Sequence, residues 1–215
     1  RLTVHYSKQM KLNGAENAVA QYRDENADFH QIVADMANIP RKQAKTINLG
    51  LSYGMGKEKL IKELGIDDTE AESLFQQYHA NVPFIRALQD QCARVAMERG
   101  YIKTFAGRHC RFNLWESRYE RTLPLPLEEA KEKYGEDLKR SYTYKALNRL
   151  IQGSAADMTK LAMIGLWEEG IVPHLQVHDE VDISIENTEQ ANTGARIMGN
   201  CVEIAVPLLV SMELG

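Results

Sequence analysis

Two cations and one apolar residue recur at intervals of four in the segment RKQAKTINLG, which begins at residue 41. On a helix, Arg41, Lys45 and Leu49 would share one flank, with a drift of roughly 40° per step. A nucleoside triphosphate needs fixed positive charge at its phosphates and an apolar surface at its base and sugar, and this row offers both. The row therefore favours a triphosphate site, although an isolated Arg and Lys at this spacing more often mark only the exposed face of an amphipathic helix.

Two carboxylates, Asp179 and Glu180, lie at the centre of the alternating run HLQVHDEVDISI. The alternation predicts a β-hairpin whose turn carries the acids at the end of a rigid ribbon. Phosphoryl transfer through two metal ions needs hard oxygen ligands for Mg²⁺, and a carboxylate at such a turn suits that task. Taken by itself, HDE is more often an exposed acidic turn.

Two amide side chains, Asn148 and Gln152, lie four residues apart in a long predicted helix and would share a face. Amides both donate and accept hydrogen bonds, so the pair can read the minor-groove acceptors that every correctly formed base pair presents. The alternative is a buried polar pair that joins two helices.

The elements that must position these side chains are helical in the first half of the chain. Apolar spacing and capping residues predict helices over 16–22, 29–36, 41 to about 50, 57–64, 67–78 and 84–99. We expect Gly65 and Gly100 to end two of these helices, because glycine adopts the left-handed conformation of a helix C-cap without strain.

The second half of the chain mixes strands and helices. A short hairpin is predicted over 101–112, then an exposed, Pro-rich and acidic insertion over 122–137 that contains a solvated helix. A strong helix follows from about 140 to 169 and precedes the acidic hairpin. The chain is expected to end with a helix over 189–204 and a strand over 206–213.

The composition excludes some classes of protein. The 215 residues have a net charge of −4, which argues mildly against a cationic surface all over the protein. Three cysteines without a CxxC pair indicate neither a disulfide framework nor a zinc site, and they fit a reducing compartment. No apolar run approaches the roughly 18 residues that span a bilayer.

Several motifs in this order resemble those of family A DNA polymerases, the DNA polymerase I type. The segment RKQAKTINLGLSYG resembles their motif B and QVHDE their motif C. Between them NRLIQGSAAD resembles a helix signature of the family, while DFH and GYIKTFAGR match two further segments. Several independent motifs at consistent spacing rarely arise by chance. The resemblance implies an α+β fold, with mostly helical fingers over 1–139 that include a short palm remnant at the N-terminus and the surface insertion near 122–137. The C-terminal part of an antiparallel palm, including its hairpin, is expected over 140–215.

The resemblance also assigns roles, and the activity that it implies is template-directed DNA synthesis. It implies catalytic roles for Asp179, Glu180 and Lys45, nucleotide contact by His30, Arg41, Lys45, Leu49 and Tyr53, and DNA contact by Asn148, Gln152, His178 and Arg108. The implied partners are primer-template DNA and a dNTP, with no membrane, and the implied cofactor is Mg²⁺, two ions, with Asp179 as the metal ligand in this chain.

Three departures from the family pattern matter. Leu49 stands where the family usually has Phe or Tyr, and in this it resembles variants in viral and organellar relatives. Tyr144 stands where an Arg normally reaches the primer-terminal pair. The chain begins at what resembles the Arg after motif A, and the segment from His5 to Ser7 lies too near motif B to replace that motif. We therefore expect an incomplete second set of metal ligands, and no activity for this segment without the missing N-terminal part, on the same chain or a separate one.

Other interpretations remain open at the level of sequence. A single-subunit RNA polymerase shares the spacing of Arg, Lys and Tyr-Gly, but it normally has HDS where this chain has HDE. Two further interpretations are a non-catalytic DNA-binding remnant and one half of a split polymerase. The expected location is the cytoplasm of a bacterial or virus-infected cell, with an organelle as the alternative.

Overall fold

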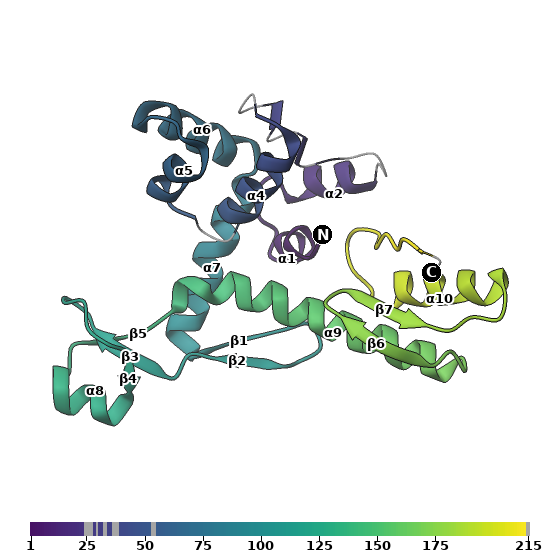
Figure 1. The fold of residues 1–215 in the computed structure, drawn as a ribbon. Coiled ribbons are helices and arrows are strands. Elements are labelled where there is room, and N and C mark those ends of the chain that lie inside the picture. The colour runs from purple at the N-terminus through teal and green to yellow at the C-terminus, as the bar shows by residue number, and fades with distance from the viewer. Residues whose placement is uncertain (24–27, 29, 32–33, 36–38, 53–54, 214–215) are drawn as a thin grey trace.

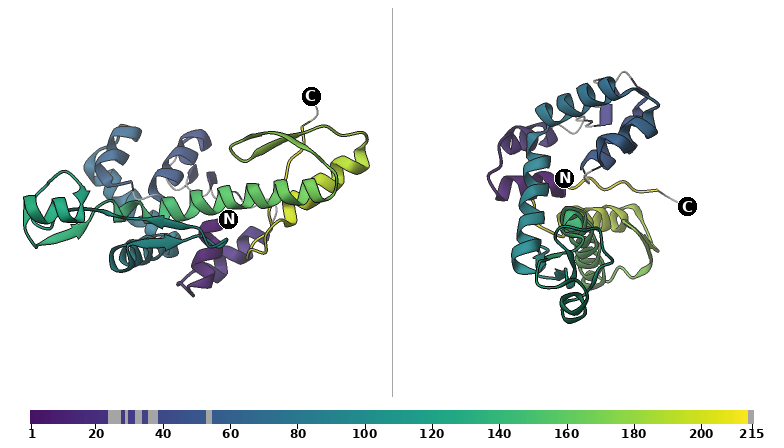
Figure 2. Two further views of the ribbon diagram at one scale, coloured as in Figure 1. Left: turned by 90° about the horizontal axis from the view of Figure 1, so that it is seen from below. Right: turned by 90° about the vertical axis from the view of Figure 1, so that its left-hand side faces the viewer.

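The long helix α9 (Ala146–Glu168) runs through the middle of the molecule, and the other elements gather along it (Figure 1). A computed structural model describes residues 1–23, 28, 30–31, 34–35, 39–52 and 55–213. Viewed from below, α9 extends as one straight helix from the β3–β5 end of the molecule to α10 (Figure 2). The predicted helix over 140–169 is thus confirmed, although it begins a few residues later.

A group of helices lies on one side of α9. It comprises α1 (Leu2–Gln9), α2 (Ala15–Arg23), α4 (Arg41–Ser52), α5 (Lys57–Leu64), α6 (Asp68–Asn81) and α7 (Pro83–Arg99). Local sequence explains several of their ends. Asp67 and Glu70 form a reciprocal capping box at the start of α6, and Pro83 occupies the first turn of α7. The helices predicted over 16–22, 57–64, 67–78 and 84–99 are confirmed.

Gly100 ends α7 with a φ of 76°, a left-handed conformation that glycine adopts without strain. A β-carbon at this position would lie 2.8 Å from the guanidinium carbon of Arg140. That guanidinium donates hydrogen bonds to the carbonyl oxygens of Met97 and Phe112, at 3.1 and 3.0 Å. The close approach of Arg140 therefore satisfies one carbonyl in the last turn of α7 and one just after β2, and together with the positive φ it favours glycine at position 100.

Short strands and small helices complete the middle of the chain. The predicted hairpin forms from β1 (Tyr101–Lys103) and β2 (His109–Arg111), with Ile102 opposite Cys110. The elements β3 (Leu114–Ser117), β4 (Leu125–Pro126), α8 (Leu127–Tyr134) and β5 (Leu138–Arg140) then form a small unit with strand order β4-β3-β5. The 3₁₀ turn η1 (Thr143–Lys145) leads into α9.

The acidic hairpin forms as predicted, from β6 (Pro173–Val177) and β7 (Glu180–Ile183), and α10 (Thr188–Asn200) packs against α9 beyond it. Val177 pairs with Glu180, so His178 and Asp179 make the turn. Together with the helical group, these short antiparallel sheets confirm the α+β class.

Two clusters of buried apolar side chains stabilise the fold, and α1 and α7 contribute to both. Phe84 lies in the cluster under α2, α4, α5 and α6, whereas Leu88 and Ala96 lie in the cluster under α9 and β1. In α1, Val4 belongs to the first cluster and Tyr6 to the second. Each fully buried large apolar side chain contributes roughly 1.5–3 kcal/mol, so these two helices hold the helical group against α9.

Some expectations were wrong. The described residues 201–213 form no strand, although a strand was expected over 206–213, and α10 ends at Asn200 rather than near 204. Pro207 lacks a backbone donor, and α1 holds this segment instead: the backbone N–H of Ala205 donates to Nδ1 of His5 at 3.1 Å, and Arg1 donates to the Pro207 carbonyl. Sequence patterns also missed α1 and the strands that flank α8.

Part of the predicted helix over 29–36 lies outside the described residues, and so does Tyr53. None of the helices that the structure describes has the length and apolar character needed to cross a bilayer.

Candidate active site

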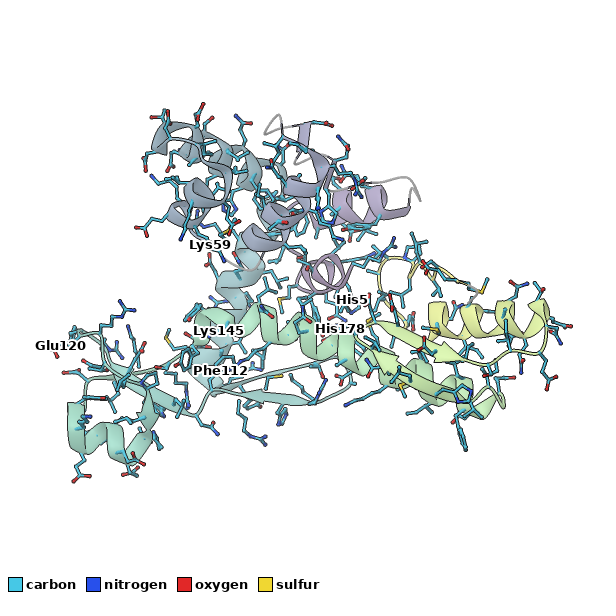
Figure 3. All side chains as sticks on the ribbon, viewed as in Figure 1. His5, Lys59, Phe112, Glu120, Lys145 and His178 are labelled. Carbon is cyan, nitrogen blue, oxygen red and sulfur yellow. The ribbon has the colours of Figure 1, made fainter. Side chains whose placement is uncertain are left out.

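A cavity of about 1030 Å³ lies between the helical group and α9, beside the turn of the β6–β7 hairpin. Side chains from α1, α4, α9 and the hairpin line it, together with part of the C-terminal segment. Five of the predicted site residues are among them: His30, Leu49, Gln152, His178 and Asp179. Figure 3 labels His178 at the end of the hairpin that lies beside α9. The tertiary structure thus brings both chemical motifs of the sequence to one space.

Asp28 organises one wall of the cavity. Its Oδ1 accepts hydrogen bonds from the backbone N–H groups of His30 and Gln31, at 2.9 and 3.2 Å. Its Oδ2 accepts from Nε of Arg41 at 2.5 Å. The hydrogen bond from Arg41, followed by those from the two backbone groups, lowers the pKa of the Asp28 carboxyl from its ordinary value. Asp28 therefore fixes the backbone at His30 and ties it to the start of α4.

His30 is connected to the interior of the helical group. Nδ1 of His30 lies 3.1 Å from Nδ2 of Asn48 on α4, and the Tyr78 hydroxyl on α6 donates to Oδ1 of Asn48 at 3.0 Å. Burial lowers the pKa of His30; Arg41 and Lys45 lower it further, and the Asp28 carboxylate opposes them. Burial also raises the pKa of Tyr78, whose hydroxyl thus keeps its proton.

The predicted row on α4 forms, but its three members differ in their surroundings. Leu49 lines the cavity and is 43% exposed. Lys45 is exposed and is not among the lining residues, yet it lies close enough to lower the pKa of His30. Arg41 is paired with Asp28, which does line the cavity. The two cations therefore border the cavity at its His30 side.

Contacts on the opposite wall fix the position of α9. The hydroxyl groups of Tyr6 and Ser154 are 2.6 Å apart, and the Arg108 guanidinium lies 2.6 Å from Oδ1 of Asp157. Arg108 also donates to the Gly153 carbonyl at 2.5 Å. With α9 held in this way, Gln152 lines the cavity.

Two predicted DNA contacts lie away from the cavity lining. Asn148 lies one turn before Gln152 on α9, so the two amides share a face of the helix as predicted, but only Gln152 lines the cavity. The guanidinium of Arg108 instead contacts Gly153 and Asp157 of α9.

The hairpin presents one carboxylate to the cavity. His178 has a φ of 57°, which lets the chain reverse within two residues, and Asp179 follows it at the turn. Both side chains are exposed and line the cavity, whereas Glu180 begins β7 and is not among the lining residues.

The described residues do not by themselves form a metal site. Among them, no three His, Cys, Asp or Glu side chains gather closely enough to hold an ion. Mg²⁺ needs near-octahedral oxygen coordination and is usually held through one or two carboxylates plus substrate phosphates and water. Asp179 fits as one such ligand, and the present residues do not complete the set.

Sequence reasoning did not include Asp28, Asn48 or Tyr78 among the site residues. Asn48 lies within the AKTIN segment and directly precedes Leu49, so its place on α4 was visible although its partner was not. Tyr78 is 30 positions from Asn48, and no local pattern relates it to His30.

Comparison with known proteins finds similarity over the whole chain. The sequence profile of DNA polymerase family A matches residues 1–215. A DNA-directed DNA polymerase of Pseudomonas phage M6 is 34% identical over 257 residues, covering 100% of this chain and 36% of that protein. The thermostable DNA polymerase I of Thermus aquaticus is 33% identical over 216 residues, covering 94% of this chain and 24% of that protein.

A solved structure is similar as well. The POL domain of Pol1 from M. smegmatis, in complex with DNA primer-template and dNTP, superposes with a TM-score of 0.69 at 27% identity. The match covers 90% of this chain and 34% of that one. The chain thus spans well under half of the length of these relatives.

Proposed function

This chain belongs to DNA polymerase family A, and we propose that it forms the fingers and the C-terminal part of the palm of a template-directed DNA polymerase. The observation that carries the proposal is the single cavity lined by His30 and Leu49 on one side and by Gln152, His178 and Asp179 on the other. The first pair suits a nucleotide, and the second group suits a primer end and its metal. The fingers would comprise residues 1–139 and the palm portion residues 140–215.

We propose that the incoming dNTP enters beside α4. Lys45 and Arg41 would attract its phosphates, since both border the cavity with positive charge and Lys45 is exposed. His30 would donate a hydrogen bond to the triphosphate, and Leu49 would pack against the base or sugar with its exposed apolar side chain. Tyr53, which follows α4, is proposed for the template side of the insertion site.

Primer-template DNA is the second proposed partner, in keeping with the complex formed by the related M. smegmatis domain. Gln152 and His178 line the cavity and can reach the minor groove of the newly formed pair. Asn148, exposed one turn away on α9, would contact the next part of the duplex. Arg108 is proposed to support this surface by holding α9, because its guanidinium is already paired with Asp157.

Family A DNA polymerases generally use Mg²⁺, and we propose that Asp179, with Glu180 beside it, supplies the carboxylate of this chain. The remaining ligands would have to come from the rest of the protein or from the substrate, because the described residues offer no group of three. We propose that the 215 residues alone do not polymerise. The cytoplasm of a bacterial or virus-infected cell is the proposed location.

Primer extension by the intact polymerase, meaning the complete protein that would contain this chain, tests the proposal. Asp179→Asn removes the negative charge of the side chain at the hairpin turn. We expect kcat to fall by about 10³-fold or more, because the metal ion that this carboxylate would hold contributes several kcal/mol of transition-state stabilisation. Asp182→Asn is the matched control: it makes the same change on β7 of the same hairpin, at an exposed residue that does not line the cavity.

The kcat of Asp182→Asn should stay within about twofold of the value for the unaltered enzyme. Equal activity of both variants would contradict the assignment of the hairpin to the catalytic site. The same assay with ribonucleotides separates the single-subunit RNA polymerase alternative, which predicts extension by rNTPs in preference to dNTPs. Complete inactivity of the unaltered protein with either substrate would favour a non-catalytic DNA-binding protein.

A further inference from the structure

A relay of three polar side chains, Tyr78, Asn48 and His30, connects the core of the helical group to the cavity. It begins at the Tyr78 hydroxyl on α6, passes through the Asn48 amide on α4 and ends at Nδ1 of His30, with distances of 3.0 and 3.1 Å. His30 lines the cavity, whereas Tyr78 is 1% exposed. The proposed function uses His30 alone, so Asn48 and Tyr78 have no role in it so far.

The direction of these hydrogen bonds follows from the burial of Tyr78. A phenolic hydroxyl can donate or accept, and an amide can be turned to present either its oxygen or its nitrogen. If Asn48 presented its nitrogen to Tyr78, the hydroxyl would lose Oδ1 as its acceptor, in a side chain that is only 1% exposed. A buried donor without a partner costs about 1–3 kcal/mol. Tyr78 therefore donates to Oδ1 of Asn48, which leaves Nδ2 to face His30.

This orientation determines which nitrogen of His30 carries a proton. Nδ2 of Asn48 can only donate, so Nδ1 of His30 must accept, and an accepting Nδ1 has no proton. The ring is then neutral and carries its proton on Nε2. An imidazolium, with protons on both nitrogens, would face the amide N–H groups of Asn48 with no lone pair to offer them.

We propose that Asn48 and Tyr78 are positioning residues that hold His30 as the neutral Nε2–H tautomer, so that it meets the triphosphate as a hydrogen-bond donor and not as a cation. The inference deepens the proposed function and rests on it for the identity of the ligand. The positive charge at the phosphates would come from Lys45 and Arg41, and His30 would contribute direction rather than charge.

The charged groups around His30 agree with a neutral ring. Its burial, Arg41 and Lys45 all disfavour the imidazolium, and only Asp28 favours it. Asp28 is itself engaged by Arg41 and by two backbone N–H groups, which weakens its pull on the ring. Asn48 adds a hydrogen bond that the imidazolium cannot accept.

Substitution of the relay in the intact polymerase tests this. Tyr78→Phe keeps the ring in the core but removes the donor that favours the orientation of Asn48 with Oδ1 toward α6 and Nδ2 toward His30. Asn48→Asp is a second variant of equal size, whose carboxylate accepts from a protonated Nδ1. We expect the pKa of His30 to rise by about one pH unit in Tyr78→Phe, as one hydrogen bond would produce, and further in Asn48→Asp.

The measurement is a ¹⁵N NMR titration of histidine-labelled protein, with the His30 signals identified by their loss in His30→Gln. In the unaltered protein Nδ1 of His30 should show the shift of an unprotonated nitrogen and Nε2 that of a protonated one. In both variants the Nδ1 signal should move toward the protonated position. The pH at which kcat/KM for the dNTP changes on the acid side should rise in parallel.

Tyr6→Phe is the matched control, because it removes another buried tyrosine hydroxyl that is hydrogen-bonded but lies outside the relay. It should lower stability while leaving the His30 tautomer and pKa unchanged. A proton on Nδ1 in the unaltered protein, or the same His30 spectrum in Asn48→Asp, would overturn the proposal even if Tyr78→Phe did not fold. The spectra are recorded without DNA or nucleotide. Their result therefore does not depend on the outcome of the primer-extension test, and the two proposals can fail separately.

Discussion

Leu49 shows how a single side chain can decide the behaviour of the cavity. It is 43% exposed and lines the same cavity as His30, so it would contact whatever ligand lies against α4. An aliphatic side chain covers apolar surface but lacks the flat face and the quadrupole of an aromatic ring. The residue type at position 49 therefore determines which kind of contact α4 offers to a ligand in the cavity.

We predict that Leu49→Phe and Leu49→Tyr in the intact polymerase reduce its discrimination against dideoxynucleotides, by up to about tenfold, because ring contacts contribute about 0.5–1.5 kcal/mol. The ratio of kcat/KM values for dideoxy and deoxy substrates measures this. Leu49→Met is the control, since it changes shape without adding a ring. Selectivity that is identical in all four proteins would contradict the placement of Leu49 against the sugar.

At the scale of elements, α9 must keep its rotation for Gln152 to face the cavity. The bond between Tyr6 and Ser154 and the pair between Arg108 and Asp157 hold it through α1 and through the loop of the β1–β2 hairpin. Asp157 is 7% exposed, and its Oδ2 has no hydrogen-bond partner among the described residues. The carboxylate thus depends on Arg108 for the compensation of its charge.

Arg108→Ala should therefore lower the free energy of unfolding by about 2–4 kcal/mol, because it leaves a buried carboxylate unpaired. Lys139→Ala is a suitable comparison, since Lys139 makes a 3.6 Å ion pair with the more exposed Glu116. That pair should be worth about 1 kcal/mol or less. Denaturant unfolding of both variants provides the numbers, and similar losses for both would refute the dependence of Asp157 on Arg108.

At the scale of the whole molecule, α1 and α7 connect the two apolar clusters, and α1 also anchors the C-terminal segment through His5. Burial lowers the pKa values of three histidines in different parts of the fold: His5, His30 and His79. Protonation of each of these three histidines therefore disfavours the folded state, although they lie in different parts of the molecule.

Stability should fall on mild acidification. The folded state holds these histidines below the ordinary pKa of about 6.5, so below that pH the unfolded state binds more protons. Their stabilising contribution is fully present above pH 6.5 and is lost as the pH falls from there through the lower pKa values of the folded state. Thermal unfolding between pH 8 and 5 measures the effect, and His5→Asn should make the dependence shallower. A stability that increased from pH 7 to pH 5.5 would contradict it.

Much of the architecture followed from local pattern. Apolar spacing, the Asp67 capping box, Pro83 and the C-cap glycines placed α5, α6 and α7, and strict alternation placed the β6–β7 hairpin with Asp179 in its turn. These features depend on neighbours within a few residues, which the sequence displays directly. The strand expected over 206–213 failed because a strand exists only with a partner, and α1 holds that segment instead.

The sequence by itself determined which chemical groups the chain carries and the helices and hairpin that present them. Only the tertiary structure decided that His30, Leu49, Gln152, His178 and Asp179 line one cavity, that Asn148 lies outside it, and that Tyr78 reaches His30 through Asn48. The reason is that these relations join residues far apart along the chain. Burial in the two apolar clusters fixes the distances between them, and no local spacing encodes those distances.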